Sequence, residues 1–349
     1  MSAEPVDEFL RRVESVESSF RSLQDDIALR WVNDDIGTID TQLHDLPPST
    51  HQVRSRGYVF KSYLEKKAET LASQWNQLRS RVVAAVDEQS RDLRYKSDLF
   101  QQRLPFLRSN RSEVELATAE SALKDLESRT SAAKSTIKGM YETLQENIRQ
   151  TVDQVKEVAW VLDQVDGATF KLYPGECAVS AVKAQWMTSE KEGPKGILYL
   201  TDERVLFEQK EEVATKKVLF IATEKQKLQE LKWDAPLNQV ESAKASEKGG
   251  AFLGIGKKEI VEFDFGSGVK VRSALLHLEA DSDAWQALIG RVKSGDVAGE
   301  RTTPKDKAVV EAARAAPTKC TVCGATMTQA IVKGMTEIKC EYCGAVVRL

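Results

Sequence analysis

The sequence predicts a multidomain α + β protein with a long helical region, a β-rich region and a small cysteine-rich end. Apolar side chains recur at alternating spacings of three and four residues through positions 1–166, a heptad pattern that is typical of packed helices. Short alternating runs, separated by glycine, proline and charged turns, follow in positions 167–295. Two Cys-x₂-Cys pairs then lie near the end of the sequence.

Length and composition favour a cytoplasmic protein of several domains. The 349 residues exceed what one hydrophobic core usually organises, so there is room for two or three domains. Charged residues make up 30% and hydrophobic residues 41%, without the apolar run of ~18 residues that a membrane-spanning helix needs and without a signal-peptide pattern. Four of the five cysteines stand in pairs, which favours a reducing compartment.

The first helical seam is followed by two adjacent prolines. Its apolar positions are Phe9, Val13, Val16, Phe20, Leu23 and Ile27. Proline removes a backbone donor and restricts the residue before it. We therefore expect Pro47 and Pro48 to end the first helix, and Ser49 or Thr50 to cap the second.

Two further seams are longer. The second consists of Phe60, Leu64, Lys67, Leu71, Trp75, Leu78, Val82 and Ala85. It fades in the charged stretch after Arg91 and is expected to stop near Pro105. The third runs from Leu123 to Val165. Three long helices joined by short turns predict an N-terminal antiparallel helical coiled-coil bundle over residues 1–166.

The helical region contains neighbouring segments of opposite charge. Residues 1–50 carry 4 basic and 11 acidic side chains, whereas residues 51–110 carry 12 basic and 6 acidic ones. Opposite charges on successive segments are expected where two helices lie side by side. A nucleic-acid-binding protein more often has a single basic face.

Six short segments between positions 177 and 278 are predicted to be strands, and Glu259–Phe265 alternates most clearly. An amphipathic helix follows, with Asp281 or Ser282 as its N-cap. The apolar stripe of this helix consists of Trp285, Leu288, Ile289 and Val292. We expect Lys225–Trp233 to form a helix inserted between two strands.

The run G-I-L-Y-L-T-D-E-R-V-L-F at positions 196–207, set among strands that end in one closing helix, resembles GRAM or bacterial pleckstrin-homology-like (PH-like) domains. The resemblance covers about residues 170–294. It implies a PH-like bent β-barrel with a closing helix over residues 167–295, in which Thr201–Arg204 forms a hairpin turn and Leu200, Val205 and Phe207 fill the core. The resemblance also implies a surface that binds lipid or protein, and it identifies no active site.

The cysteine pairs indicate a metal site. Cys320 and Cys323 form the first pair, and Cys340 and Cys343 follow after a gap of sixteen residues. Both sulfurs of such a pair can reach one ion, and four thiolates suit a structural Zn²⁺ in a closed tetrahedral site. Residues 318–349 resemble the zinc-ribbon superfamily in this spacing. A rubredoxin-like iron site is the alternative, although rubredoxins have a longer gap between the pairs.

Three further features concern the end of the chain. A polar, alanine-rich segment at 296–317 is predicted to be a flexible linker. Gly324 and Gly344 directly follow the cysteine pairs and permit the positive-φ turn that directs backbone amides at the thiolates. The ribbon has few basic and aromatic residues but many apolar ones, which favours a protein partner over nucleic acid.

A glycine-rich loop is the candidate contact with lipid or a partner. It carries Phe252, Leu253 and Ile255, followed by Lys257 and Lys258. Apolar side chains next to lysines suit insertion at an anionic membrane surface. The alternative is that the apolar side chains fold back onto the sheet. A phosphate-binding loop is excluded because no serine or threonine follows the glycine–lysine step.

No nucleophile, general base or open metal site stands out, so we expect that the protein is not an enzyme. The expected function is that of a cytoplasmic adaptor or scaffold. The coiled coil would set assembly, including homo-oligomers; the PH-like domain would bind protein or, peripherally, an anionic membrane; and the zinc ribbon would bind a protein. The alternative is a nucleic-acid-associated factor that uses the ribbon and the basic helix at 51–110.

Overall fold

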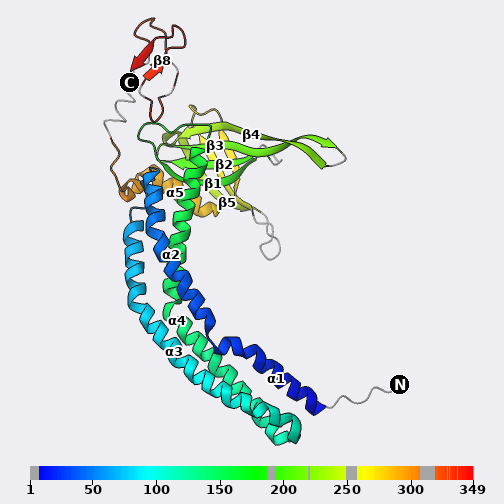
Figure 1. The fold of residues 1–349 in the computed structure, drawn as a ribbon. Coiled ribbons are helices and arrows are strands. Elements are labelled where there is room, and N and C mark those ends of the chain that lie inside the picture. Colours follow the sequence, from blue (N-terminus) through cyan, green and yellow to red (C-terminus); the bar gives the residue numbers. More distant parts are fainter. Residues whose placement is uncertain are drawn as a thin grey trace. The chain divides into compact units, whose positions relative to one another are not determined.

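The computed structural model describes residues 8–187, 193–218, 221–248, 258–306, 319–327, 329, 331–335 and 337–348 (Figure 1). The chain divides into two compact units. We call residues 1–49 and 64–154 the helical unit, and residues 50–63 and 155–349 the sheet unit. The last turns of the fourth helix therefore group with the sheet.

Four helices occupy the N-terminal region, which confirms a helical bundle there. They are α1 (Glu8–Ile27), α2 (Arg30–Ser55), α3 (Leu64–Asn110) and α4 (Glu113–Asp166). Within the helical unit, α3 and α4 run side by side in opposite directions (Figure 1). Its core is a continuous apolar cluster drawn from all four helices, which includes Val13, Phe20, Val32, Trp75, Leu93, Ile137 and Ile148.

The predicted end of the first helix is wrong. Pro47 and Pro48 lie inside α2, and the break comes earlier, at Leu29, whose φ of 51° ends α1. Each proline costs the helix a hydrogen bond. The continued helix buries Leu46 and Val53 on either side of the prolines, and this burial offsets the cost.

The second seam also extends beyond its predicted end. α3 continues through Pro105 to Asn110. Phe100 and Leu107 are buried on this extension, and the Phe100 ring lies 4.8 Å from that of Phe20 in α1. Burial of large apolar side chains again outweighs the local preference of proline.

The oppositely charged segments do lie side by side. Arg108 of α3 pairs with Glu17 of α1 at 2.7 Å, and Arg79 of α3 pairs with Asp40 of α2 at 3.1 Å. Both pairs are partly exposed, so each contributes little to stability. They instead favour one arrangement of the helices over others.

The sheet unit contains seven antiparallel strands. They are β1 (Ala178–Met187), β2 (Lys195–Thr201), β3 (Arg204–Val218), β4 (Ile221–Pro236), β5 (Val240–Lys248), β6 (Lys258–Phe265) and β7 (Ser273–Leu278), with a 3₁₀ turn η1 (Leu237–Gln239) before β5. The strand order is β4-β3-β2-β1-β7-β6-β5. No hydrogen-bonded ladder among the described residues joins β4 to β5, so the predicted bent β-barrel is corrected to an open sheet.

The open sheet is nevertheless bent around an aromatic core. The ring of Trp233 in β4 lies 6.2 Å from Phe263 and 5.2 Å from Phe265, both in β6. β4 and β6 lie in opposite halves of the strand order, so these contacts require the sheet to fold over on itself. Phe207 of β3 stacks on Trp233 in the same core.

The predicted helix at Lys225–Trp233 is wrong. This segment belongs to β4 and pairs with β3 along a long ladder with bulges. Helical and strand preference compete in so polar a segment. The ladder hydrogen bonds and the almost complete burial of Trp233 decide in favour of the strand.

The closing helix agrees with the prediction. α5 (Ser282–Ser294) begins after Asp281, whose Oδ1 accepts a hydrogen bond of 2.8 Å from the Ala284 N–H. Its apolar side chains Trp285, Ile289 and Val292 are buried, and the helix packs against β5 and β6.

Part of the predicted linker is ordered. Residues 296–300 form the 3₁₀ helix η2 (Asp296–Glu300). The Thr302 N–H then donates to the Val59 carbonyl at 2.7 Å, and the Ser62 N–H donates to the Glu300 carbonyl at 3.0 Å. These backbone hydrogen bonds hold the segment, which composition alone had assigned to a tether. Residues 307–318 lie outside the described residues.

The cysteine-rich end contains a small hairpin of β8 (Glu337–Lys339) and β9 (Val346–Arg348). Among the described helices, none combines the length and apolar character required to cross a bilayer.

The Asp281 cap provides a test of this fold. Replacement of Asp281 by Ala should lower the free energy of unfolding by about 1 kcal/mol, because the Ala284 N–H loses its acceptor. Urea unfolding followed by tryptophan fluorescence would measure the loss. Asp283→Ala, in the same first turn, is the matched control and should change stability by less than about 0.5 kcal/mol. Equal losses in both variants would contradict the assigned cap.

Candidate metal centre

The four paired cysteines converge on one point. Their sulfur atoms all lie within 4.8 Å of one another. The Sγ atoms of Cys320 and Cys343 are 3.6 Å apart, and those of Cys323 and Cys340 are 3.7 Å apart. Residues that are 17 and 23 positions apart in the sequence are therefore brought to one site.

Two similar turns position the sulfurs. In the first, the Gly324 N–H donates to the Cys320 carbonyl at 2.9 Å, and in the second the Gly344 N–H donates to the Cys340 carbonyl at the same distance. The two glycines have φ values of 71° and 75°. This left-handed conformation is costly for other residues, which explains a glycine directly after each pair.

Each turn is closed by flanking strand pairing. The Cys320 N–H donates to the Ala325 carbonyl and the Cys340 N–H donates to the Ala345 carbonyl, both at 2.8 Å. An isolated bridge between Lys319 and Thr326 supports the first turn, and the β8–β9 pairing supports the second. The chain thus builds the same turn twice.

The backbone also adjusts the acidity of the thiols. The N–H groups of Cys323 and Val322 point at the Cys320 sulfur and lower its pKa to about 6. For Cys343 the Ala345 N–H lowers the pKa, but the hydrogen bonds with Cys323 and the other sulfurs outweigh it and raise the pKa to about 12. Four thiolates this close repel one another, so a bound cation is needed before all four can lose their protons.

The residues present fit a tetrahedral metal ion. A zinc–sulfur bond of about 2.3 Å places the ligands of a regular tetrahedron about 3.8 Å apart. The Cys320–Cys343 and Cys323–Cys340 sulfur pairs, at 3.6 and 3.7 Å, agree with that spacing. Cys320 and Cys340 are buried, and Cys323 and Cys343 lie on the exposed side. Four protein ligands complete the coordination, so an ion here would have no open position for substrate or water.

Of the five residues predicted to contact lipid or a partner, the structure describes one. Phe252, Leu253, Ile255 and Lys257 lie outside the described residues. Lys258 is described, and it begins β6 opposite Lys248 of β5. The cysteine cluster and this loop belong to separate parts of the sequence.

The sheet unit contains a buried ion pair that the sequence alone does not predict. Arg204 and Glu176 are almost completely buried, and Arg204 Nε donates to Glu176 Oε1 at 2.9 Å. Thr201 Oγ1 donates to the same oxygen at 2.7 Å, and Arg204 Nη1 donates to Asp234 Oδ2 at 2.9 Å. The Arg204 guanidinium also lies 3.8 Å from the centroid of the Tyr173 ring. The Thr201–Arg204 motif is the local sequence signal for this ion pair, although the sequence alone indicates only a turn there.

A second buried carboxylate lies nearby in the sequence. Glu208 accepts hydrogen bonds from the Thr169 N–H at 2.7 Å and from the Tyr199 hydroxyl at 2.9 Å. Burial, and then the Glu208 charge, raise the pKa of Tyr199. A Cβ atom at Gly196 would lie 1.9 Å from the Glu208 carbonyl oxygen, so only glycine fits there.

Both buried carboxylates have a structural role. The two oxygens of Glu176 accept hydrogen bonds from Thr201, Arg204 and the Tyr173 N–H, and those of Glu208 accept hydrogen bonds from Thr169, Tyr199 and Gln229. Carboxylates with every oxygen engaged hold the segment after α4 against the sheet and are not poised for proton transfer.

Comparisons with known proteins leave the family open. No protein family and no curated protein matches the sequence. The C-terminal domain of an unknown protein from Leishmania infantum is 13% identical, with 34% of this chain and 85% of that chain covered, at a TM-score of 0.21. The DH/PH domains of p115-RhoGEF are 13% identical to this chain. The match covers 82% of this chain and 94% of that chain, at a TM-score of 0.22.

The DH/PH domains of PDZ-RhoGEF, solved in complex with GTP-γ-S-activated RhoA, are 8% identical, with 83% and 96% covered, at a TM-score of 0.25. At TM-scores this low, the likenesses carry no argument about what this chain does.

The buried ion pair can be tested by mutation. Arg204→Met should lower the free energy of unfolding by about 3–5 kcal/mol, because it leaves Glu176 buried without its cation. The double variant Glu176→Gln/Arg204→Met should recover part of that loss. Urea unfolding measures both, with Arg272→Met, at an exposed arginine, as the control. A loss below about 1 kcal/mol for Arg204→Met would show that the pair is not a support of the fold.

Proposed function

We propose that the protein is a non-catalytic adaptor whose C-terminal zinc ribbon binds a protein partner. The observation that carries the proposal is the closed cluster of four cysteine sulfurs, which all lie within 4.8 Å of one another. A four-coordinate site supplies structure and no reaction centre. Zinc is the proposed ion because it favours tetrahedral thiolate sites and takes no part in redox chemistry.

The sheet unit is the proposed second binding module. The pattern at positions 196–207 resembles PH-like domains, which supports binding of a protein or an anionic membrane surface. The seven-stranded antiparallel sheet with a C-terminal helix is compatible with this. We propose Phe252 and Leu253, next to Lys257 and Lys258, as the point of membrane contact.

The ion pairs of the helical unit weigh against a nucleic-acid-binding role. The alternative relied on the basic segment at residues 51–110. Two of its cations, Arg79 and Arg108, are engaged by Asp40 and Glu17 of the preceding helices. A phosphate backbone is bound by cations that are free to replace its counterions. We therefore propose that the protein is an adaptor and that it acts in the cytoplasm.

Metal analysis tests the proposed zinc ribbon. Protein purified without chelators should contain one Zn²⁺ ion per chain by inductively coupled plasma mass spectrometry, because four thiolates complete one site. Cys320→Ser and Cys343→Ser should each lose most of the metal. Cys177→Ser is the matched control, since this buried cysteine directly precedes β1 and is not one of the four clustered cysteines, and it should retain the metal. Iron in place of zinc, or metal that depends on Cys177, would refute the assignment.

A binding titration separates the adaptor from a nucleic-acid-associated factor. Fluorescently labelled random-sequence DNA and RNA should bind the full chain no more tightly than about 10⁻⁴–10⁻⁶ M at physiological salt, the range of non-specific electrostatic binding. Affinity tighter than this, with a steep dependence on salt, would favour the nucleic-acid-associated factor.

Liposome co-sedimentation tests the membrane contact. If the glycine-rich loop inserts, binding to vesicles that contain phosphatidylserine should be lost in Phe252→Asp/Leu253→Asp, because carboxylates repel the anionic surface. Val83→Asp, an exposed position in the helical unit, is the control and should bind as the unchanged chain does. Absence of binding to any anionic vesicle would restrict the sheet unit to protein partners.

A further inference from the structure

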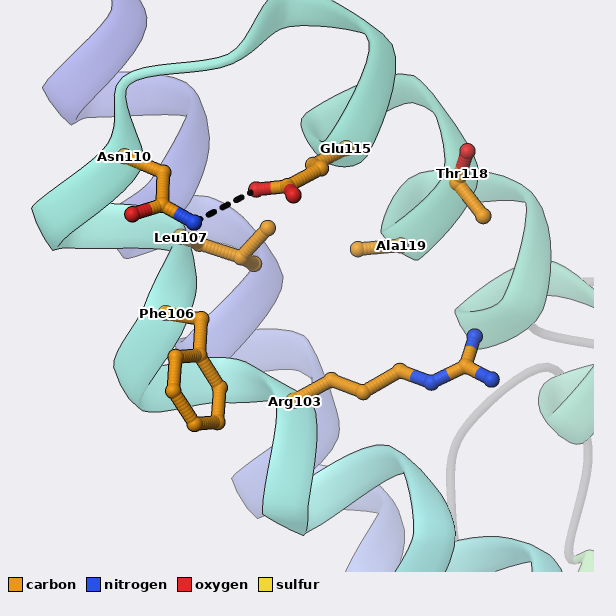
Figure 2. Close-up of a pocket in the computed structure, with 7 residues that line it drawn as sticks. All are labelled: Arg103, Phe106, Leu107, Asn110, Glu115, Thr118 and Ala119. Atoms are coloured by element: carbon orange, nitrogen blue, oxygen red, sulfur yellow. Dashed lines mark hydrogen bonds between the residues drawn. The ribbon is translucent and has the colours of Figure 1, made fainter.

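A hollow lies at the end of the helical unit where α3 turns into α4 (Figure 2). Its volume is about 390 Å³. The lining residues are Arg103, Phe106, Leu107, Asn110, Glu115, Thr118 and Ala119. Figure 2 shows that they come from both helices, with Leu107 and Ala119 between the two backbones and Arg103 extending across the open side toward α4. Leu107 and Ala119 are buried, so the floor of the hollow is apolar.

An exposed apolar stripe on α3 leads to this hollow. Tyr95, Leu99 and Phe106 are exposed by 65%, 42% and 62%. The spacings of four and seven residues place all three on one face of the helix. From Tyr95 to Phe106 this face is about 16 Å long, or three helical turns. Single exposed apolar residues are ordinary, whereas an aligned set beside a pocket indicates an interaction surface.

The stripe is turned away from the helix that already packs on α3. Phe100 marks the side of α3 that meets α1, through its ring contact with Phe20. At 3.6 residues per turn, the three stripe residues lie roughly 100–140° around the helix from Phe100. α1 therefore covers one side of the α3–α4 pair, and the stripe belongs to another side.

The charges at the rim select the chemistry of an occupant. Within the described residues, the Arg103 guanidinium makes no hydrogen bond and no ion pair. The rim carboxylate, by contrast, is engaged, since Asn110 Nδ2 donates to Glu115 Oε2 at 3.4 Å (Figure 2). The hollow thus offers a free cation above an apolar floor, which complements a carboxylate next to an apolar side chain.

We propose that this face, formed by the stripe and the hollow, binds an amphipathic helix of a partner protein that presents apolar side chains at i, i+3 or i+4 and i+7 together with a carboxylate for Arg103. Two antiparallel helices form a groove that a further helix can fill. The stripe of three turns is long enough to contact the apolar positions i to i+7 of such a helix. The proposal rests on the adaptor role and specifies the chemical class of one partner, at a surface separate from the zinc ribbon.

Selection from a peptide library tests the proposal. An mRNA-displayed library of helical peptides of roughly twenty residues would be selected against the full chain. Enriched peptides should carry the apolar spacing and an aspartate or glutamate. The binding of one such labelled peptide should weaken at least tenfold with Phe106→Ser and with Arg103→Glu. Val83→Ser and Arg81→Glu, exposed elsewhere on α3, are matched controls and should bind unchanged.

Reversal of the charge at Arg103 gives a second test, in which the expected result is a gain of peptide binding that an unfolded variant could not show. A peptide whose carboxylate is replaced by lysine should bind Arg103→Glu better than it binds the unchanged chain. Peptides without acidic positions, equal binding to all variants, or failure to select any peptide would overturn the proposal. A concentration-dependent dimer that Phe106→Ser abolishes in sedimentation would also overturn it, since the occupant would be a second copy. If the selected peptides bind only through the metal-loaded ribbon, this surface fails while the adaptor role stands.

Discussion

The ion pair between the buried guanidinium of Arg204 and the carboxylate of Glu176 is the interaction on which the seven-stranded sheet depends. A cation removed from water must be paired and fully hydrogen-bonded, and this requirement determines its surroundings. Glu176 supplies the counter-charge, Asp234 of β4 a second one, and the Lys171 carbonyl a further acceptor. The Thr201 hydroxyl, at the start of the β2–β3 turn, donates a hydrogen bond to the Glu176 carboxylate. A single side chain therefore links the β2–β3 turn, β4 and the segment between α4 and β1.

The cysteine-rich end is stabilised by a different kind of constraint. Of its described residues, few apolar side chains are buried, among them Ile338 and Val347 on the paired strands β8 and β9. So small a core does not hold a domain without help. Two repeated turns bring the four sulfurs together, and metal binding would supply the free energy that apolar burial does not. The seven-stranded sheet, by contrast, packs around a cluster of aromatic side chains that includes Phe207, Trp233 and Phe265.

Binding, as we propose it, is distributed over separate surfaces and not concentrated in one cleft. The ribbon, the sheet and the face of α3 near Phe106 differ in chemistry, so each selects its own partner. Modules on one chain raise the effective concentration of their partners for one another. A scaffold of this kind gains affinity from several moderate contacts, without a catalytic centre.

The sequence by itself determined the features that depend on local spacing. Heptad positions such as Phe20 and Ile137 predicted helices because a helical face is set by residues three and four apart. Equally short patterns predicted a cap at Asp281 or Ser282, of which the structure selects Asp281, and a single site for the paired cysteines. In each case the chemistry lies within a few residues or in a repeated motif.

Only the tertiary structure decided the rest. α2 runs through Pro47, and Trp233 lies on a strand, because burial against distant parts of the chain outweighs local preference. The pairing of Arg204 with Glu176, 28 positions apart, has no spacing rule that predicts it. That Arg103 has no carboxylate partner among the described residues likewise depends on which side chains the fold brings near it. Long-range contacts select among conformations that a short segment alone leaves nearly equal in free energy.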